Sequence, residues 1–283
     1  MRMDASQFLQ QRLQEKKVLI AVHRGAWGGS IIENTVPAYE AALNMGADMF
    51  ECDVAKSTDG VLYAIHDGYE MRLLHKRKNI KTLDSKTINR LRYFNSIGNP
   101  TDQPVQRLEE VLDHFRSGEL YNLDRAWSIL PELHTVLQRF PHAMAQAIIK
   151  TPAKSQYLDF FRECPTKYMY MPICRTREAL DEVLSRDCIN LVGVELIVSS
   201  PEHPLFDKNL LRQLRERGLF IWVNAITLSN REKHILSAGF DDDLALRKGP
   251  EVAWGKLMEQ GFNVIQTDWP AQLSRFRDNF LSL

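Results

Sequence analysis

The chain of 283 residues is long enough for one large domain or two ordinary ones, because α/β barrels of this size commonly form a single unit. Hydrophobic residues make up 44% and charged residues 25%, which is typical of a globular protein and excludes extended disorder. Lysine plus arginine equals aspartate plus glutamate at 36 each, so the overall charge gives no reason to expect a nucleic acid or an anionic membrane as partner.

The N-terminal segment is polar and helix-prone, and it lacks the apolar stretch of a secretory signal. No later run approaches the ~18 apolar residues of a membrane-spanning helix. We therefore expect a cytoplasmic protein without stable membrane insertion. The sequence does not predict its oligomeric state.

Residues 18–22 form the first apolar run, which is typical of a strand buried on both faces of a parallel sheet. The run ends in His23, Arg24 and Gly25. After a glycine-containing loop, Glu33, Asn34 and Thr35 precede an amphipathic helix, with Asn34 or Thr35 as a plausible N-cap. Taken alone, these three residues are explained by capping.

A hairpin is predicted over residues 48–67. In its first arm Phe50, Cys52 and Val54 alternate with Glu51 and Asp53, so the two carboxylates share one face of the strand. A turn at 57–60 leads into the apolar run 61–65, which delivers His66. Paired carboxylates suit Mg²⁺ or Ca²⁺, and a nearby imidazole suits proton transfer. A solvated face of an antiparallel pair is the other interpretation of this hairpin.

Residues 68–104 have no clean strand, and a helical pattern runs through Ile88, Leu91 and Phe94. We interpret them as an insertion within a single domain spanning 1–283, and the basic cluster at 72–78 as a solvated loop. The next helix is expected to open at Pro104 and 108–112. Six more strands, alternating with helical patterns, are predicted near 120–124, 145–150, 168–173, 191–196, 219–224 and 264–267.

These patterns give nine strands, of which one hairpin arm must be antiparallel, because parallel neighbours need a long crossover. The other eight fit a (β/α)8 TIM barrel, an α/β fold whose catalytic groups follow the C-terminal ends of its strands. A doubly wound open sheet is the alternative. The polar residues that fall at such ends are His23, Glu51, Asp53, Asp124, Lys150, Asn224 and Asp268.

Six short blocks in register resemble the glycerophosphodiester phosphodiesterase family. Its pattern reads HRG, ENT, GAD-x-x-E-x-D-V, T-x-DG and HD, and this chain matches the order and spacing over ~45 residues. The matching blocks are 23–25, 33–35, 46–48, 51–54, 58–60 and 66–67. Weaker likeness extends over nearly the whole chain, at Arg72, 108–112, 222–224 and 267–268.

The resemblance implies a TIM barrel that hydrolyses glycerophosphodiesters, small-molecule substrates, with one divalent metal ion, Mg²⁺ or Ca²⁺. It implies that Glu51 and Asp53 bind the metal and that His23 and His66 are the general acid and base. Arg24 would pair with a phosphate oxygen. Glu33 and Asn34 would hold metal, glycerol hydroxyl or His23 in place.

One block departs from the family pattern. Where the family usually has E-I-K, supplying a third metal ligand and a phosphate-binding lysine, this chain has Asp124, Arg125 and Ala126. Asp124 can still bind a metal, but the lysine is absent. Lys150, at the end of the next strand, is the candidate replacement. Trp222 either lines the substrate pocket, which we favour, or fills the core.

Two alternatives to the family reaction stay open. The first is phospholipase D-like cleavage of lysophospholipid or sphingolipid-type diesters, for which Phe94, Met169, Met171 and Trp222 would supply an apolar channel. The second is a catalytically inactive barrel that binds a phosphodiester. The missing lysine favours the second, whereas the intact histidines and the paired carboxylates oppose it.

Overall fold

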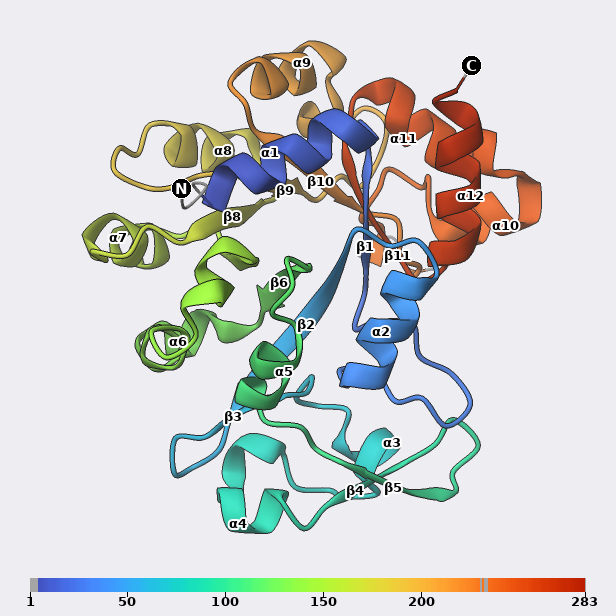
Figure 1. Ribbon diagram of the computed structural model, residues 1–283. Helices are drawn as coiled ribbons and strands as arrows, with labels where there is room; N and C mark the ends of the chain where they lie inside the picture. The colour runs from blue at the N-terminus through green and yellow to red at the C-terminus, as the bar shows by residue number, and fades with distance from the viewer. Residues whose placement is uncertain (1–4, 230, 232–233, 283) are drawn as a thin grey trace.

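Eight parallel strands close into a barrel in the computed structural model, which describes residues 5–229, 231 and 234–282 (Figure 1). Neighbours in the barrel follow chain order, and β1 pairs with both β2 and β11. Because this closure leaves no edge, the (β/α)8 prediction is confirmed and the open doubly wound sheet was wrong. The strands are β1 (Leu19–Val22), β2 (Met49–Lys56), β6 (Leu120–Asp124), β7 (Ala147–Pro152), β8 (Met169–Cys174), β9 (Gly193–Leu196), β10 (Phe220–Asn224) and β11 (Val264–Thr267).

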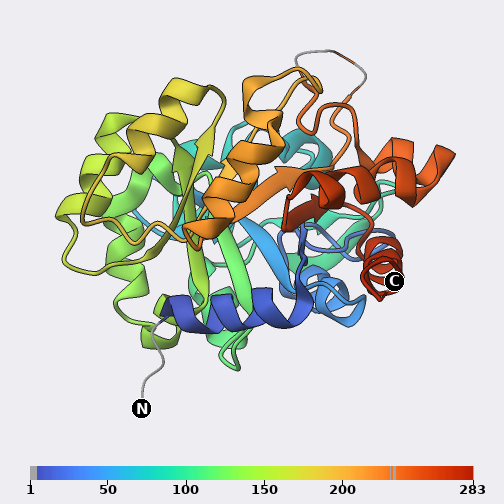
Figure 2. The same ribbon diagram turned by 90° about the horizontal axis from the view of Figure 1, so that it is seen from above.

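Helices cover the outer face of the barrel (Figure 2). Outward-facing strand residues such as Phe50, Cys52 and Val54 share one core with helix residues, including Tyr39. Since side chains alternate along a strand, Glu51 and Asp53 point into the barrel, as predicted. The helices are α1 (Ala5–Lys16), α2 (Val36–Asn44), α5 (Leu108–His114), α6 (Leu130–Leu137), α7 (Ser155–Glu163), α8 (Arg177–Leu184), α9 (Lys208–Glu216), α10 (Asp242–Lys248), α11 (Trp254–Gln260) and α12 (Pro270–Phe280). Among the described helices, none combines the length and apolar composition that crossing a membrane requires.

The N-terminal end of the barrel is closed by packing. Leu9 and Leu13 of α1 join the apolar residues inside the barrel, among them Leu19 and Met49. Beside them, Asp48 and Arg277 form an ion pair between the start of β2 and α12, and both side chains are almost completely buried. The apolar packing and the buried ion pair therefore contribute stability at this end.

A small lobe lies beside the hairpin that β2 makes with the antiparallel β3 (Leu62–Ala64), at the bottom of Figure 1. It contains α3 (Glu70–Leu74), α4 (Ser85–Ile88), β4 (Arg92–Phe94) and β5 (Pro100–Pro104). Leu74, Ile80, Ile88 and Tyr93 form its core together with Tyr63 of β3. This lobe covers part of the segment interpreted above as an insertion.

The expectation for this segment was wrong in two respects. The helical pattern ends at Ile88, and β4 pairs with β5 in a two-stranded antiparallel sheet with an irregular register. The signal was weak because Tyr93 is the only buried residue of the two short strands, and β5 begins and ends with proline. Pro104 accordingly ends a strand, and α5 begins at Leu108.

Candidate active site

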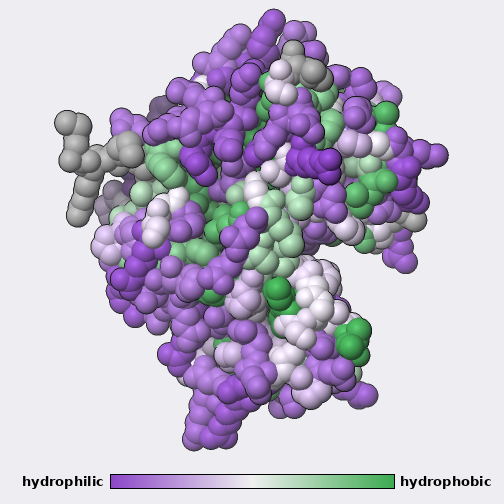
Figure 3. All heavy atoms as spheres, turned by 45° about the vertical axis from the view of Figure 1, so that its right-hand side comes forward, coloured by the Kyte–Doolittle hydropathy of each residue, from purple (hydrophilic) through white to green (hydrophobic). Residues whose placement is uncertain are grey.

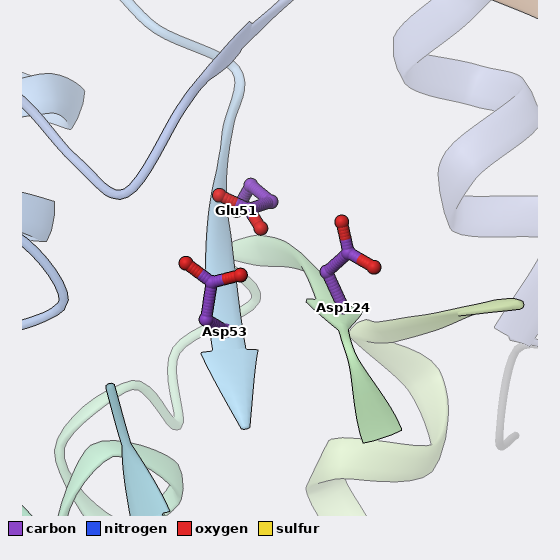
Figure 4. Close-up of side chains that lie close together, drawn as sticks. All are labelled: Glu51, Asp53 and Asp124. Atoms are coloured by element: carbon purple, nitrogen blue, oxygen red, sulfur yellow. The ribbon is translucent and has the colours of Figure 1, made fainter. Parts of the chain in front are cut away.

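Three carboxylates converge inside the C-terminal end of the barrel (Figure 4). Glu51 and Asp53 come from β2 and Asp124 from the last residue of β6, which lies directly beside Asp53 in the parallel register. One carboxylate oxygen from each residue lies within 4.8 Å of the others. Hard oxygen donors at this spacing match the ligands that Mg²⁺ and Ca²⁺ prefer. The three predicted metal ligands therefore lie together.

The electrostatics of this cluster also fit a cation. Burial, with Asp53 and Asp124 nearby, raises the pKa of Glu51 well above its usual range. Burial acts the same way on Asp53, but Arg24 and His66 outweigh it and hold the pKa of that carboxyl below its usual value. A cation between the carboxylates would remove the repulsion that Glu51 experiences.

The sharp turn after β1 positions Arg24 against the cluster. Gly25 has a φ of +78°, and a Cβ there would lie 2.7 Å from the backbone of Ala38, so only glycine fits. The turn directs the Arg24 backbone N–H to Glu51 Oε2 (2.9 Å). It also directs the guanidinium Nε to Asp53 Oδ2 (3.0 Å). The HRG block is thus a structural device that brings a buried cation to the carboxylates.

Asn34 and Glu33 act in different places, and neither caps α2. The Asn34 side chain donates to Asp53 Oδ2 (3.0 Å) and accepts from the Asp53 backbone N–H (2.9 Å). Glu33 accepts from Arg24 Nη1 (3.0 Å) and from Arg72 Nη2 (2.6 Å). Thr35 occupies the N-cap position of α2 without a side-chain cap bond. Thr35 is thus the N-cap by position, as one of the two expected residues, but capping alone does not explain this block, because Glu33 and Asn34 hold the charged groups of the site.

The structure corrects the expectation of a solvated basic loop at one position. Residues 75–78 are exposed, as expected, but Arg72 is anchored by Glu33. Its guanidinium lies 4.8 Å from the ring centre of Tyr69, which is also 4.8 Å from the guanidinium of Arg24. No local pattern predicts this pair, because Glu33 and Arg72 are 39 residues apart.

Both predicted histidines follow strand ends at the mouth of the barrel, and each uses Nδ1 for a fixed hydrogen bond. His23 Nδ1 lies 3.1 Å from Asp268 Oδ1, and His66 Nδ1 lies 2.7 Å from the carbonyl oxygen of Asp67. Because both partners are acceptors, Nδ1 carries the hydrogen and Nε2 is the nitrogen available for proton transfer. Burial lowers the pKa of His66.

Asp268 was recognised as a strand-end residue but not as a partner of His23. Its backbone N–H donates to Asp242 Oδ2 (2.9 Å), and Asp242 Oδ1 accepts from Trp254 and Thr267. Burial raises the pKa of Asp242 to about 7. These bonds fix the end of β11, and with it the carboxylate beside His23. The Thr267-Asp268 pair was noted in the sequence as a weak likeness to the family, but that likeness did not indicate which residue Asp268 contacts.

Lys150 lies inside the barrel next to the carboxylates. Its Nζ is 2.7 Å from Asp124 Oδ2 and 3.0 Å from Glu195 Oε2, and Glu195 is a residue of β9 that no sequence motif singled out. Burial opposes the charged form, but Asp124, Glu195 and Glu51 outweigh it and raise the pKa of Lys150. Lys150 is thus a buried cation beside the third carboxylate.

Trp222 is fully buried in the barrel interior, with its ring 5.6 Å from Lys150 Nζ. Its indole N–H donates to Asn224 Oδ1 (2.7 Å), and the Asn224 amide donates to Glu195 Oε1 (2.9 Å). Because it is fully buried, Trp222 could affect substrate binding only indirectly, through the side chains that it contacts, Lys150 and Asn224.

Residues 23–242 match the model of the glycerophosphoryl diester phosphodiesterase family. A glycerophosphodiester phosphodiesterase of Bacillus subtilis is 33% identical over 234 residues, which cover 74% of this chain and 76% of that protein. One named GDPD4 from Arabidopsis thaliana is 24% identical over 257 residues, which cover 82% of this chain and 73% of that protein.

Solved structures share the fold at low identity. A glycerophosphoryl diester phosphodiesterase from Parabacteroides distasonis superposes with a TM-score of 0.72 at 20% identity, covering 93% of this chain and 86% of that one. An Oleispira antarctica phosphodiesterase in complex with the product sn-glycerol-3-phosphate gives 0.61 at 17% identity, covering 94% and 97%. Fold and comparisons define a barrel enzyme of the phosphoric diester hydrolase class. The chain belongs to the glycerophosphoryl diester phosphodiesterase family.

Proposed function

We propose that the protein hydrolyses glycerophosphodiesters to glycerol 3-phosphate and an alcohol, with one divalent metal ion, Mg²⁺ or Ca²⁺. The observation that carries the proposal is the convergence of Glu51, Asp53 and Asp124 beside Arg24 at the barrel mouth, where His23 and His66 also lie. Family membership and the names of the relatives support the same reaction.

Glu51, Asp53 and Asp124 are the residues that would hold the metal ion. Their donor set consists of carboxylate oxygens, and the raised pKa of Glu51 reflects a site that gains from added positive charge. When bound, the ion would neutralise charge on the phosphoryl oxygens. Asn34 and the Arg24 backbone keep the carboxylates of β2 in position.

Arg24 and Lys150 supply the protein's own positive charge to the phosphate. A guanidinium has five N–H donors, and the two ion pairs of Arg24 use Nε and Nη1, so we assign Nη2 to a phosphate oxygen. Lys150 pairs with Asp124 and Glu195 and has a third N–H for the phosphate. In this proposal Lys150, on the neighbouring strand, replaces the phosphate-binding lysine of the family, because this chain has Ala126 at that lysine's position.

The two histidines move the protons. One Nε2 takes the proton of the nucleophile, and the other gives a proton to the departing alcohol. The nucleophile is either a hydroxyl of the substrate's glycerol, which would form a cyclic phosphate that water then opens, or water itself. Asp268 is a positioning residue: it holds the His23 ring and stabilises its charged form during the transfer.

The experiment that tests the proposal measures glycerol 3-phosphate released from glycerophosphocholine and glycerophosphoethanolamine by purified protein. It is run with EDTA, with Mg²⁺ and with Ca²⁺, and repeated with His66→Ala. We expect metal-dependent release that the variant loses. Full release in EDTA would refute the metal requirement. Release by His66→Ala at the wild-type rate would refute the catalytic role of His66.

The phospholipase D-like alternative loses most of its predicted channel. Met169, Met171 and Trp222 are fully buried among the apolar residues inside the barrel, so they line no route for a lipid chain. Phe94, the fourth residue, lines a cavity. The inactive binding barrel is disfavoured because the carboxylates, both histidines and Arg24 are all present at one end of the barrel. Absence of hydrolysis with every metal and substrate, despite tight binding of a diester, would favour it.

A further inference from the structure

A cavity of about 380 Å³ lies next to the candidate site, between the β1–α2 loop and the tip of the β4–β5 hairpin. Glu33, which pairs with Arg24, forms part of its wall, so the cavity adjoins the proposed phosphate position. The rest of the wall is mainly apolar and includes Trp27, Ile31, Leu73 and Phe94. An apolar space thus lies beside the Arg24–Glu33 pair, on the side where Arg72 also contacts Glu33.

A backbone hydrogen bond joins the two walls of this cavity, and one wall is itself a hydrogen-bonded turn. Gly28 and Ile31 exchange a pair of N–H to carbonyl bonds of 3.0 Å, which makes the loop a tight turn. The Ser96 N–H at the hairpin tip donates to the Gly29 carbonyl (3.1 Å). Phe94 is supported from behind by a stacked His75 ring at 3.6 Å. The cavity is thus a built feature of two segments far apart in the sequence.

The charges at the cavity disfavour a cationic substituent. Arg72 lies 5.5 Å from the ring centre of Trp27 and 4.8 Å from that of Tyr69, and Arg24 also lies over Tyr69. Aromatic faces of this kind bind quaternary ammonium groups when they are free. Here guanidinium groups already cover them, so choline would meet positive charge instead of a π face.

The opposite side of the barrel mouth has a different chemistry. Lys150 of β7, Glu195 of β9 and Asn224 of β10 place polar atoms there, and β9 lies across the barrel from β2. Glycerol hydroxyls lose free energy when they leave water without a hydrogen-bond partner, whereas an alkyl chain gains. The two halves of a glycerophosphodiester therefore suit different sides of the site.

We propose that this cavity binds the alcohol portion of the substrate and selects an uncharged alcohol with a hydrocarbon chain. The inference rests on the proposed hydrolysis and names the substrate class. Trp27 and Ile31 are 45% and 39% exposed, and Ile97 at the hairpin tip is 79% exposed, so the apolar surface continues outward from the cavity. Figure 3 shows less hydrophilic surface in the recess between the barrel and the small lobe.

The test compares the hydrolysis of alkyl esters of glycerol 3-phosphate, with methyl, butyl and hexyl chains, against that of glycerophosphocholine. We expect KM to fall by about two- to fourfold for each added methylene while kcat changes little, because the added contacts are equal in the bound and transition states. We expect glycerophosphocholine to have a higher KM than the butyl ester. An absence of any hydrolysis would refute the proposed function itself. Hydrolysis with equal KM values, or with choline preferred, would overturn only the cavity assignment.

Trp27→Ala and Ile31→Ser test the cavity wall. In both variants KM should depend much less on chain length than it does in the wild type. Leu246→Ser, at an exposed position of α10 that does not line the cavity, is the matched control and should keep the dependence. A chain-length dependence that survives in both folded wall variants would contradict the assignment.

Arg72→Gln tests the charge selection separately. The substitution removes the cation over Trp27, so this ring becomes available to an ammonium group, while Arg24 still lies over Tyr69. We expect the KM ratio of glycerophosphocholine to the butyl ester to fall by about threefold or more. An unchanged ratio in the folded variant would mean that Arg72 does not determine the choice of alcohol.

Discussion

The two ends of the barrel use buried charge in opposite ways. At the N-terminal end, the buried carboxylate of Asp48 meets the guanidinium of Arg277, which also pairs with the exposed Asp278, and apolar residues of α1 cover the interior. At the C-terminal end, three carboxylates lie together, and the cations Arg24 and Lys150 are shared among several acids. Paired charge stabilises a fold, whereas clustered like charge costs stability and persists where it binds something. The difference identifies which end has a function.

The largest expected effect is at the N-terminal end. Arg277→Met leaves Asp48 buried without its partner, and breaking a buried pair in this way costs about 3–5 kcal/mol. Urea unfolding measures this loss. The matched control is Arg275→Met, at an exposed position of the same helix, which should change stability by less than about 0.5 kcal/mol. Equal effects of the two substitutions would contradict the distinction between the ends.

At the C-terminal end, His23→Ala or His66→Ala should lower kcat by ~10²-fold or more, which corresponds to about 2.7 kcal/mol, and leave the unfolding midpoint nearly unchanged. His114→Ala is the control, because His114 is exposed and pairs with Glu40 outside the site. Steady-state kinetics with circular dichroism checks both parts. Turnover at the wild-type rate by either site variant would remove that histidine from the mechanism.

A smaller effect is expected for the positioning residue. Asp268→Asn keeps an acceptor for His23 Nδ1 but removes the negative charge that stabilises the imidazolium, so kcat should fall about tenfold. Asp243→Asn, which breaks only an exposed pair with Arg247, should leave kcat unchanged. If Asp268→Asn lowers the melting temperature and leaves kcat intact, Asp268 is structural only.

The smallest expected effect is a gain in stability, whereas the three preceding predictions are losses of stability or activity. The folded state raises the pKa of Glu51, so its contribution to stability is fully present below the unfolded-state pKa and is lost as pH rises through the folded-state pKa. Glu51→Gln does not titrate. In EDTA it should gain about 1 kcal/mol over the wild type, and more at neutral than at acidic pH. Added Mg²⁺ or Ca²⁺ should stabilise the wild type alone. Thermal unfolding across pH measures both, and a variant less stable than the wild type in EDTA would show that the cluster is not repulsive.

The sequence predicted the barrel because its strands are short apolar runs that end in polar residues, and both features are local. The same local patterns were enough to assign Glu51, Asp53, His23 and His66 to one end of the sheet. Asp124 was recognised as a strand-end residue, and its role as a third metal ligand came from the resemblance; the parallel register then places it beside Asp53. Local patterns failed at β4 and β5, where a single buried tyrosine gives no alternation.

The contacts that connect the site could not be predicted. His23 and Asp268 are 245 residues apart, and Arg72 reaches Glu33 from another segment. Such pairings depend on how loops fold over the barrel mouth, for which single residues give no pattern. Trp222 illustrates the same limit, because a tryptophan at a strand end fits a pocket and a core equally well until its burial is known.

The central claim is that the carboxylate cluster binds a cation that phosphodiester hydrolysis requires. The most direct test measures glycerol 3-phosphate released from a glycerophosphodiester as free Mg²⁺ or Ca²⁺ rises from zero, for the wild type and for Glu51→Gln. The account predicts a saturating rise with at least one ion in the wild type and little release by the variant at any concentration. Full release without metal, or the same titration curve for both proteins, would contradict it.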